Sequence, residues 1–381
     1  MIEFKVSAPG KIILYGEHAV VYGKTAVAGT VNLRTTLQFI ELPHDQLNIQ
    51  LSIPKSNLLL NVQLNQIQEF FFGSETTQSI DTHETLYAHV QKFVEKIGYV
   101  NLQQQSTLES IFYLLISVSQ AQALTLKPFK LHLDGVLPIG AGLGSSASFS
   151  VCLAACFIHW SHLQNSQNRI LDEKLLEKIS NYAFNCEKIM HHTPSGIDNT
   201  ICTYGSFVEF RKGEEPVPII TSKKMRVLVI DTKVQRSTKV LIERLRNLKE
   251  KYPDIFHPIF DSIDNVSKEA VKIIRQIHDL PDDHSDLYEG YKKLMSLIEI
   301  NQGLLVACNV SHPSLDKICM EARRFNLSAK LSGAGGGGCA YVLLMPDTSE
   351  NVIANFSEKL SSDGYTVQLT TLGGPGVEIH S

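Results

Sequence analysis

Glycines at 140, 142 and 144 stand directly before Ser145 and Ser146, within the segment 137–147. Glycine lets the backbone turn tightly and lets an anion approach the amides. The free N–H groups and the positive dipole end of a following helix then attract a phosphate. A turn capped by a serine needs fewer glycines than this. The segment therefore predicts a phosphate site made of Gly140, Ala141, Gly142, Leu143, Gly144, Ser145 and Ser146.

Two acidic residues could supply a cation site and a base. Glu187 lies late in an expected helix, and Asp198 follows just beyond a turn at 193–196. Mg²⁺ takes carboxylate, hydroxyl and phosphate oxygens, so Glu187 with Ser146 could hold the ion and leave Asp198 to meet a substrate hydroxyl. Taken alone, each acid is better explained as a surface residue, so this prediction depends on the neighbouring phosphate site.

The segment 7–28 places Lys11, Glu17 and His18 among small and apolar residues. Each of them alone fits a solvated strand end, but three ionisable residues in such a stretch favour a site. The segment also contains Gly23-Lys24-Thr25, which suggests a P-loop. That loop requires a glycine five residues before Gly23, where this chain has His18.

A third glycine cluster lies at 330–340. Gly333, Gly335 and Gly338 match the spacing G-x-G-x-x-G of dinucleotide-binding folds, but Cys339 begins an expected strand where such a fold requires a helix. The cluster is better interpreted as a loop that touches a ligand held by the other domain. One alternative is that the cluster binds NAD and that the protein is an oxidoreductase. Another is that the glycines form a plain wide hairpin with no functional role.

Cys156, His159 and His162 fall on one face of an expected helix and mimic part of a zinc site. They lack a fourth ligand. A packed thiol beside two exposed histidines explains them better.

Composition narrows the possible partners. The 35 Lys and Arg residues against 39 Asp and Glu leave a net charge of −4, so nucleic acid and anionic membranes are not expected partners. The seven cysteines include no C-x-x-C pair and suit reduced thiols. No signal peptide is evident, and the longest apolar stretch, 149–160, is too short to span a bilayer. We therefore expect a cytoplasmic protein.

The elements that must position these residues form two groups, with a boundary near 212–226 that divides the chain into domains 1–220 and 221–381. The first should hold strands and helices around the phosphate loop, with a small-residue helix at 145–163 directly after it. The second contains two strand-helix-strand units, which suggest a ferredoxin-like α+β sandwich. The expected strands are 2–8, 31–41, 47–51, 128–134, 199–203, 206–210, one from 226, 328–332, 339–345 and 364–370; the expected helices are 83–99, 107–124, 145–163, 172–190, 236–251, 257–279, 286–309, 314–325 and 349–361.

The three glycine- and charge-bearing segments, in this order, resemble the motifs of the GHMP kinases over essentially the whole chain. PIGAGLGSSAS resembles the phosphate loop of that superfamily and KLSGAGGGGCA its third motif. APGKIILYGEHAVVYGKTAVA and HHTPSGIDNT are most similar to the mevalonate kinase branch. The resemblance implies a two-domain α+β fold, with an N-terminal mixed β-sheet domain whose helices carry the phosphate loop and a C-terminal ferredoxin-like domain.

The resemblance also implies an activity, which is phosphorylation of the 5-hydroxyl of (R)-mevalonate by ATP. It makes Asp198 the catalytic base, with Lys11 beside it and also in contact with ATP. It assigns Mg²⁺ to Ser146 and Glu187. It places Glu17, His18, Thr238 and Ala334 at the substrate and leaves a homodimer open. One departure is Gly135, where relatives carry a serine near the nucleotide.

Two alternatives stay within this fold. One is a GHMP kinase for another small molecule, such as a phosphomevalonate kinase or a galactokinase-like enzyme. The other is an inactive relative that senses a metabolite. An inactive relative would have lost the lysine, a magnesium ligand or the base, whereas Lys11, Ser146, Glu187 and Asp198 are all present.

Overall fold

The computed structural model describes residues 2–73, 82–138, 140–166, 171–191, 196–219, 221, 223–235, 237–278 and 280–380. The strands within these ranges are β1 (Glu3–Tyr15), β2 (Ala26–Glu41), β3 (Asn48–Ile53), β4 (Leu58–Gln63), β5 (Phe129–Gly135), β6 (Phe207–Phe210), β7 (Val217–Ile219), β8 (Met225–Asp231), β9 (Ser328–Leu331), β10 (Cys339–Leu343), β11 (Thr366–Leu372) and β12 (Glu378–His380). They form one sheet whose main path runs β4-β3-β5-β2-β11-β8-β10-β9, with β1, β6, β7 and β12 attached off this path.

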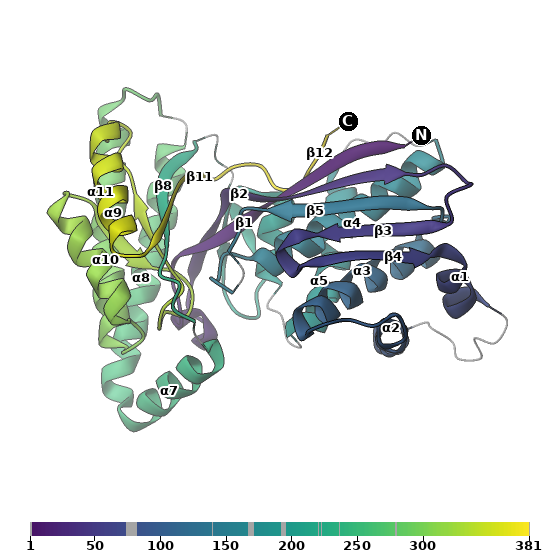
Figure 1. Ribbon diagram of the computed structural model, residues 1–381. Coiled ribbons are helices and arrows are strands. Elements are labelled where there is room, and N and C mark those ends of the chain that lie inside the picture. The colour runs from purple at the N-terminus through teal and green to yellow at the C-terminus, as the bar shows by residue number, and fades with distance from the viewer. Residues whose placement is uncertain are drawn as a thin grey trace.

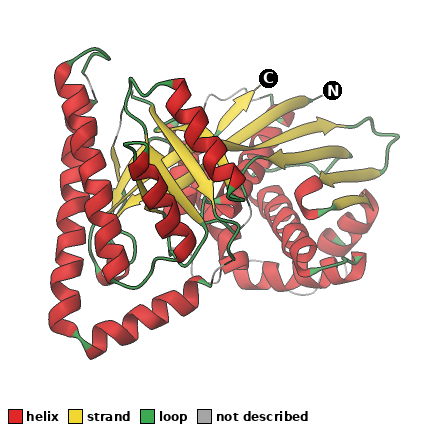
Figure 2. Cartoon of the chain, turned by 60° about the vertical axis from the view of Figure 1, so that its left-hand side comes forward, coloured by secondary structure: helices red, strands yellow, loops and turns green. Residues whose placement is uncertain are grey.

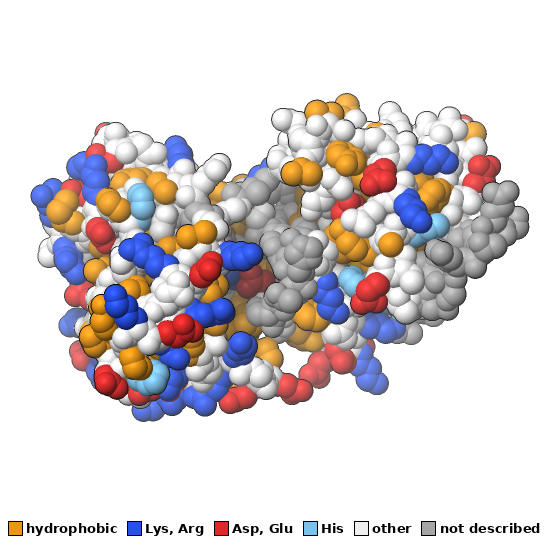
Figure 3. All heavy atoms as spheres, turned by 90° about the horizontal axis from the view of Figure 1, so that it is seen from below, with side chains coloured by type: hydrophobic (Ala, Val, Ile, Leu, Met, Phe, Trp, Pro, Cys, Tyr) orange, Lys and Arg blue, Asp and Glu red, His pale blue; other side chains and the backbone are white. Residues whose placement is uncertain are grey.

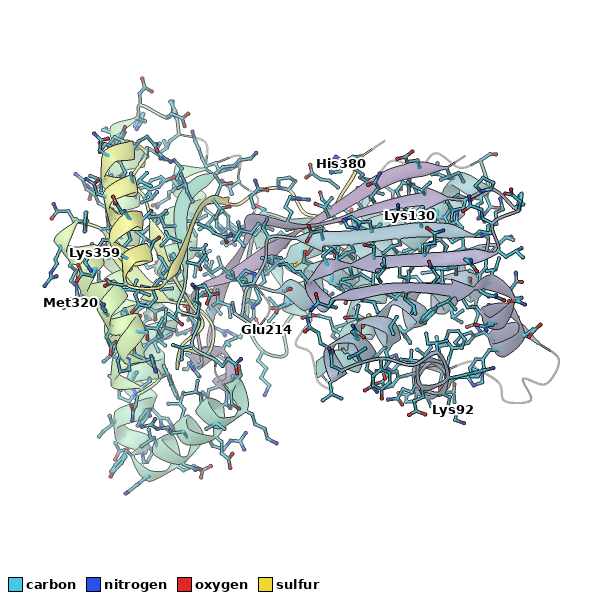
Figure 4. All side chains as sticks on the ribbon, in the orientation of Figure 1. Lys92, Lys130, Glu214, Met320, Lys359 and His380 are labelled. Atoms are coloured by element: carbon cyan, nitrogen blue, oxygen red, sulfur yellow. The ribbon has the colours of Figure 1, made fainter. Side chains whose placement is uncertain are left out.

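In the N-terminal half, a sheet is covered by helices on one face, as Figure 1 shows on its right-hand side. Residues of β3 alternate between buried and half-buried, so that one set faces the helices and the other faces outward. Lys130 of β5 lies on the outward face (Figure 4). The helices of this half are α1 (Leu64–Phe72), α2 (His83–Ile97), α3 (Leu102–Ala121), α4 (Ser145–Gln164), α5 (Glu173–His191) and α6 (Ile197–Tyr204), with short 3-10 turns at Ala19–Tyr22 and Pro54–Ser56.

The central helix of this half is α4, which is apolar on all sides. Ser, Ala and Cys let it pack closely against β1, β2, α3 and α5, so nearly every side chain after its first turn is buried. By length and composition α4 could cross a membrane, but 83% of its apolar window is buried inside the fold, as in a core helix. The helix is thus a rigid base for the loop that precedes it.

The C-terminal half is a sheet in the order β11-β8-β10-β9 with helices packed on it, which Figure 2 shows at the front. Neighbouring strands are all antiparallel. This arrangement confirms the predicted two-domain α+β fold with a ferredoxin-like second part. Its helices are α7 (Thr238–Lys251), α8 (Pro253–Ile277), α9 (Ser285–Ala307), α10 (Pro313–Arg324) and α11 (Glu350–Ser362).

The two halves form separate masses (Figure 3) that are joined along the sheet. Within the sheet, β11 of the C-terminal half pairs with β2 of the N-terminal half at Leu372 and Val31. The chain end then returns to the N-terminal half, where β12 pairs with β1 and His380 Nε2 lies 3.0 Å from Ser7 Oγ. Figure 4 shows His380 beside the strands of that half.

One predicted strand is wrong. Residues 199–203 were expected to be extended, but they belong to helix α6. The β-branched residues favour a strand locally, whereas Gly196, in the left-handed conformation, starts a helix whose buried face packs on α4 and β1. Tertiary packing overrides the local preference. As a result, Asp198 lies in the first turn of a helix.

Other differences concern strand ends and elements that the prediction missed. β1 continues to Tyr15 where the prediction ended at residue 8, and β2 begins at Ala26, five residues earlier than predicted. Lys11 is therefore inside a buried strand and not at a solvated strand end. β4 and α1 had no counterpart in the prediction.

Candidate active site

The predicted phosphate loop adopts the conformation that its glycines allow. Gly140, Gly142 and Gly144 all have positive φ, at 75°, 82° and 72°. Gly144 is the N-cap of α4, and its lack of a side chain leaves the first turn without a side-chain cap. The positive dipole end of α4 thus faces this loop with no side-chain cap from its N-cap residue, which suits an anion.

The loop lies directly against β1. The backbone N–H of Lys11 donates to the carbonyl of Leu143 at 2.9 Å. A Cβ on Gly144 would lie 2.7 Å from Cγ of Lys11, which is too close for any other residue type. Glycine at 144 therefore serves both the left-handed turn and the close approach to Lys11.

Lys11 forms an ion pair with Asp198 of α6. The Lys11 Nζ and Asp198 Oδ2 atoms are 3.2 Å apart, and the side chains are 8% and 34% exposed. Strand pairing with β2 and the hydrogen bond from the N–H of Lys11 to the phosphate loop both fix the backbone of this lysine. A carboxylate beside a fixed ammonium, open to the cavity on one side, can accept a proton from a bound hydroxyl.

Glu187 on α5 adds a second carboxyl group to the same cavity. It is 2% exposed, and burial together with the charge of Asp198 raises its pKa to about 8, while Lys11 opposes the shift. Ser146 also lines the cavity. Among the described residues, no cluster of three or more His, Cys, Asp or Glu side chains has the spacing of a metal centre. Ser146 and Glu187 thus supply a hydroxyl and one carboxyl group between them.

These groups line one large cavity between the two halves, with a volume of about 910 Å³. It reaches from the phosphate loop to the third glycine segment, so residues far apart in the sequence face the same space. The predicted site residues that line it are Lys11, Glu17, His18, Gly140, Gly142, Gly144, Ser145, Ser146, Glu187, Asp198, Thr238 and Ala334. Ala141 and Leu143, which were also predicted to contact ATP, are buried, at 6% and 1% exposure.

His18 and Ala334, which both line the cavity, are in contact with each other. The Nε2 atom of His18 lies 2.8 Å from the carbonyl oxygen of Ala334. Because that oxygen only accepts, Nε2 carries the hydrogen and Nδ1 carries the lone pair in the neutral ring. Thr238 also lines the cavity and is the first residue of α7, whose N-cap is Ser237. The third glycine segment leads into strand β10 and not into a helix, as predicted, which argues against a dinucleotide-binding fold.

Glu17 occupies a different environment from the one predicted. It is 1% exposed, and its carboxylate forms a buried ion pair with Lys330 of β9. Its other oxygen accepts a hydrogen bond of 3.0 Å from Nδ2 of Asn301 in α9. Sequence reasoning missed Lys330 and Asn301. A lysine inside the apolar strand that leads into a glycine loop was the signal that could have identified the first of them.

The opposite end of the cavity is lined by residues that sequence reasoning did not single out. They come from several elements and are Ile53, Lys55, Ser56, Gln103, Ser106, Thr107, Leu133 and Asp134. Nζ of Lys55 donates to the carbonyl of Leu137, just before the phosphate loop, and burial lowers the pKa of Lys55. Gly135 lines the same end, so its backbone faces the cavity.

The candidate zinc residues of α4 lie elsewhere. Cys156, His159 and His162 are 0%, 8% and 5% exposed, so the expectation of two exposed histidines is wrong. Burial lowers the pKa of His159 to about 4, with a further contribution from His162. The ring of His159 packs edge-on against Phe4. These residues belong to the core of the N-terminal half.

Comparisons with known proteins match the whole chain. Family models for the GHMP kinases N-terminal domain and the GHMP kinases C-terminal domain match residues 110–206 and 287–362. The mevalonate kinase of Bos taurus is 36% identical over 99% of this chain and 94% of its own length. The mevalonate kinase of Arabidopsis thaliana is 33% identical over 99% of this chain and 100% of its own.

Solved structures with the same fold include several kinases. A mevalonate kinase of L. major in complex with R-mevalonate aligns with a TM-score of 0.70 at 22% identity, covering 97% of this chain and 96% of that one. The Lactococcus lactis galactokinase complexed with galactose aligns with a TM-score of 0.61 at 15% identity, covering 99% and 95%. These likenesses concern the fold, whereas the sequence identity to curated relatives is decisive for the branch. The chain belongs to the mevalonate kinase family of the GHMP kinases.

Proposed function

We propose that this protein transfers the γ-phosphoryl group of ATP to the 5-hydroxyl of (R)-mevalonate. The observation that carries the proposal is the Lys11–Asp198 pair, which lies in one cavity with the phosphate loop and has a contact of 3.2 Å. Phosphoryl transfer depends mainly on alignment and charge neutralisation. A base, a cation and a phosphate-binding loop in one cavity provide both.

The roles of the residues follow from their positions. The amides of Gly140 to Ser146 would bind the ATP phosphates, and Lys11, directly beneath the loop, would offset charge on the transferred group. Asp198 would accept the proton of the attacking hydroxyl, because its carboxylate lines the cavity beside the ammonium of Lys11. The end of the cavity near Lys55 and Gln103 would then take the nucleoside.

Magnesium is a further part of the proposal. Ser146 and Glu187 both line the cavity and present hard oxygen donors, a hydroxyl and a carboxyl group. Residues of this chemistry fit Mg²⁺. When bound, the ion would screen the charge of the ATP phosphates and of the transition state.

The substrate end favours a short branched acid over a sugar. Ile13, Val20, Val21 and Ile242 are among the residues that line the cavity. His18, whose Nε2 is held by the carbonyl of Ala334, is a polar anchor whose Nδ1 could accept a hydrogen bond from the tertiary hydroxyl of mevalonate. A ring of sugar hydroxyls would require more polar partners than these apolar residues provide.

A release assay for ADP tests the proposal. Purified protein would be assayed side by side with mevalonate, phosphomevalonate, galactose and homoserine. We expect turnover with mevalonate to exceed that with every other alcohol. Faster turnover with galactose or homoserine would refute the substrate assignment and leave the fold unaffected.

A further inference from the structure

A completely buried ion pair joins the two halves behind the substrate end of the cavity. The side chains of Lys330 and Glu17 are both 0% exposed. Nζ of Lys330 also donates to the carbonyl of Leu331 at 2.7 Å, and Asn301 donates to Glu17 at 3.0 Å. The three residues lie on β9, on the turn after β1 and on α9. Removing two charges from water is costly, so such a pair is weak evidence for stability alone.

Each partner of the pair leads along the backbone to a residue of the substrate end. Glu17 is followed immediately by His18, and Lys330 precedes the loop that carries Ala334. His18 and Ala334 are themselves joined at 2.8 Å. The ion pair, the two backbone segments and the hydrogen bond together form a closed ring of connections.

A second tie fixes the same loop to β1. Oγ of Ser332 accepts from the N–H of Ile13 at 3.2 Å and donates to the carbonyl of Ile13 at 2.9 Å. The chain between Lys330 and Ala334 is therefore held at its start and in its middle. Its last part is held by His18.

The backbone of His18 requires such support. Its φ is 62°, a left-handed value that costs free energy in a residue other than glycine. Such a conformation persists where the surroundings over-determine it. The neighbouring Glu17, anchored on two sides in the protein interior, supplies this constraint.

We propose that Lys330, acting through Glu17 and together with Asn301, is a positioning residue that fixes His18 and Ala334 at the substrate end. The proposal rests on the proposed function, because that function defines the substrate end. Lys330 is fully buried and acts through Glu17, so neither the ATP end nor the reacting atoms depend on it directly. Its loss should affect the binding of the alcohol and spare the binding of ATP.

Two variants test this proposal, and a third serves as their control. Asn301→Ala removes one hydrogen bond to Glu17 without leaving a new buried charge. The double variant Glu17→Gln with Lys330→Met removes both charges together, which avoids the unpaired charge of a single change. We expect both to raise KM for mevalonate, by roughly tenfold for a lost hydrogen bond to a charged group. KM for ATP should stay within about twofold of the native value.

The matched control is Lys127→Met, which breaks the Lys127–Glu41 pair (3.2 Å) in the N-terminal half, outside the cavity. It should lower the thermal midpoint and leave both KM values unchanged. This control separates a general loss of stability from misplacement of the substrate end.

The outcomes are exclusive. The proposal holds if KM for mevalonate rises while KM for ATP does not, in variants whose thermal midpoint is no lower than that of the control. It is overturned if KM for mevalonate is unchanged, or if both KM values rise in parallel. If the double variant does not fold, or if the two variants give different results, the result for Asn301→Ala is decisive.

Failure of this proposal is distinguishable from failure of the proposed function. The native protein is assayed first with the panel of alcohols. If another alcohol is the better substrate, the proposed function fails, and the same variants are then tested with that alcohol. If mevalonate is the substrate and its KM is the same in Asn301→Ala as in the native protein, the positioning role alone fails.

Discussion

Replacement of Gly144 by alanine should impair catalysis through Lys11, although no charged residue is replaced. Gly144 has φ 72° and ψ 30°, and an added Cβ would lie 2.7 Å from Cγ of Lys11. Ordinary contact begins near 3.4 Å, so the lysine side chain must move by about 0.7 Å. Lys11 Nζ is 3.2 Å from Asp198, and this movement changes their alignment.

The expected effect has two parts. The left-handed conformation costs alanine about 1–2 kcal/mol of stability. Displacement of a positioned catalytic group by nearly 1 Å can reduce the rate by up to roughly 100-fold. We therefore expect kcat to fall between about 10- and 100-fold.

Gly23→Ala provides the matched control. Gly23 has nearly the same backbone, with φ 76° and ψ 20°, and a Cβ there would meet nothing within 4 Å. It should lose similar stability and keep its activity. Thermal midpoints and steady-state kcat would be measured for both variants. Equal kcat in the two variants, at equal fractions of folded protein, would show that the approach of the loop to Lys11 has no catalytic role.

Four further predictions concern other groups. Asp198→Asn should reduce kcat by about 10²–10⁴-fold while ATP still binds in a calorimetric titration; activity within a factor of about two of the native value contradicts this role. Ser146→Ala and Glu187→Gln should each raise the Mg²⁺ concentration needed for half-maximal rate, and their effects should not add in the double variant because they serve one ion. His18→Ala should raise KM for mevalonate far more than KM for ATP, by about 1–3 kcal/mol of lost binding, and equal changes would contradict it. Because the pKa of His159 falls from 6.5 unfolded to about 4 folded, its contribution to stability is complete above pH 6.5 and is lost as the pH falls towards 4, by up to about 3 kcal/mol; His159→Gln should flatten denaturant-derived stability over this range, and an unchanged slope would refute the assignment.

Much of the candidate site could be predicted because its residues lie in short segments with unusual composition. Three glycines in five residues already indicate a tight turn of the backbone. In the structure, Gly140, Gly142 and Gly144 all have positive φ. The ion pair of Lys11 with Asp198 was also predicted, and the contact is confirmed at 3.2 Å. The catalytic, binding and metal roles of these residues stay predictions.

The part that could not be predicted depends on contacts between distant segments. Lys330 and Glu17 are 313 positions apart, and no local pattern shows that they meet. The helix α6 was missed for a similar reason, because burial against α4 decides its conformation. The nucleoside end of the cavity is assembled from separate turns, strands and helices, each with ordinary composition.

Some predictions stay outside what the fold tests. The domain boundary between 220 and 221, a cytoplasmic location, a homodimer and the absence of nucleic-acid or membrane partners all stay predictions. Ile139 and residues 192–195 of the sequence motifs lie outside the described residues. A sedimentation experiment would determine the oligomeric state.

The most direct test of the central claim is phosphorus NMR of the product formed from ATP and (R)-mevalonate. Transfer to the primary 5-hydroxyl predicts a new phosphomonoester resonance coupled to the methylene protons of C5, formed with the R enantiomer and absent with Asp198→Asn. A new phosphorus signal without coupling to C5 protons, or ADP formed with no phosphorylated mevalonate, would contradict the account.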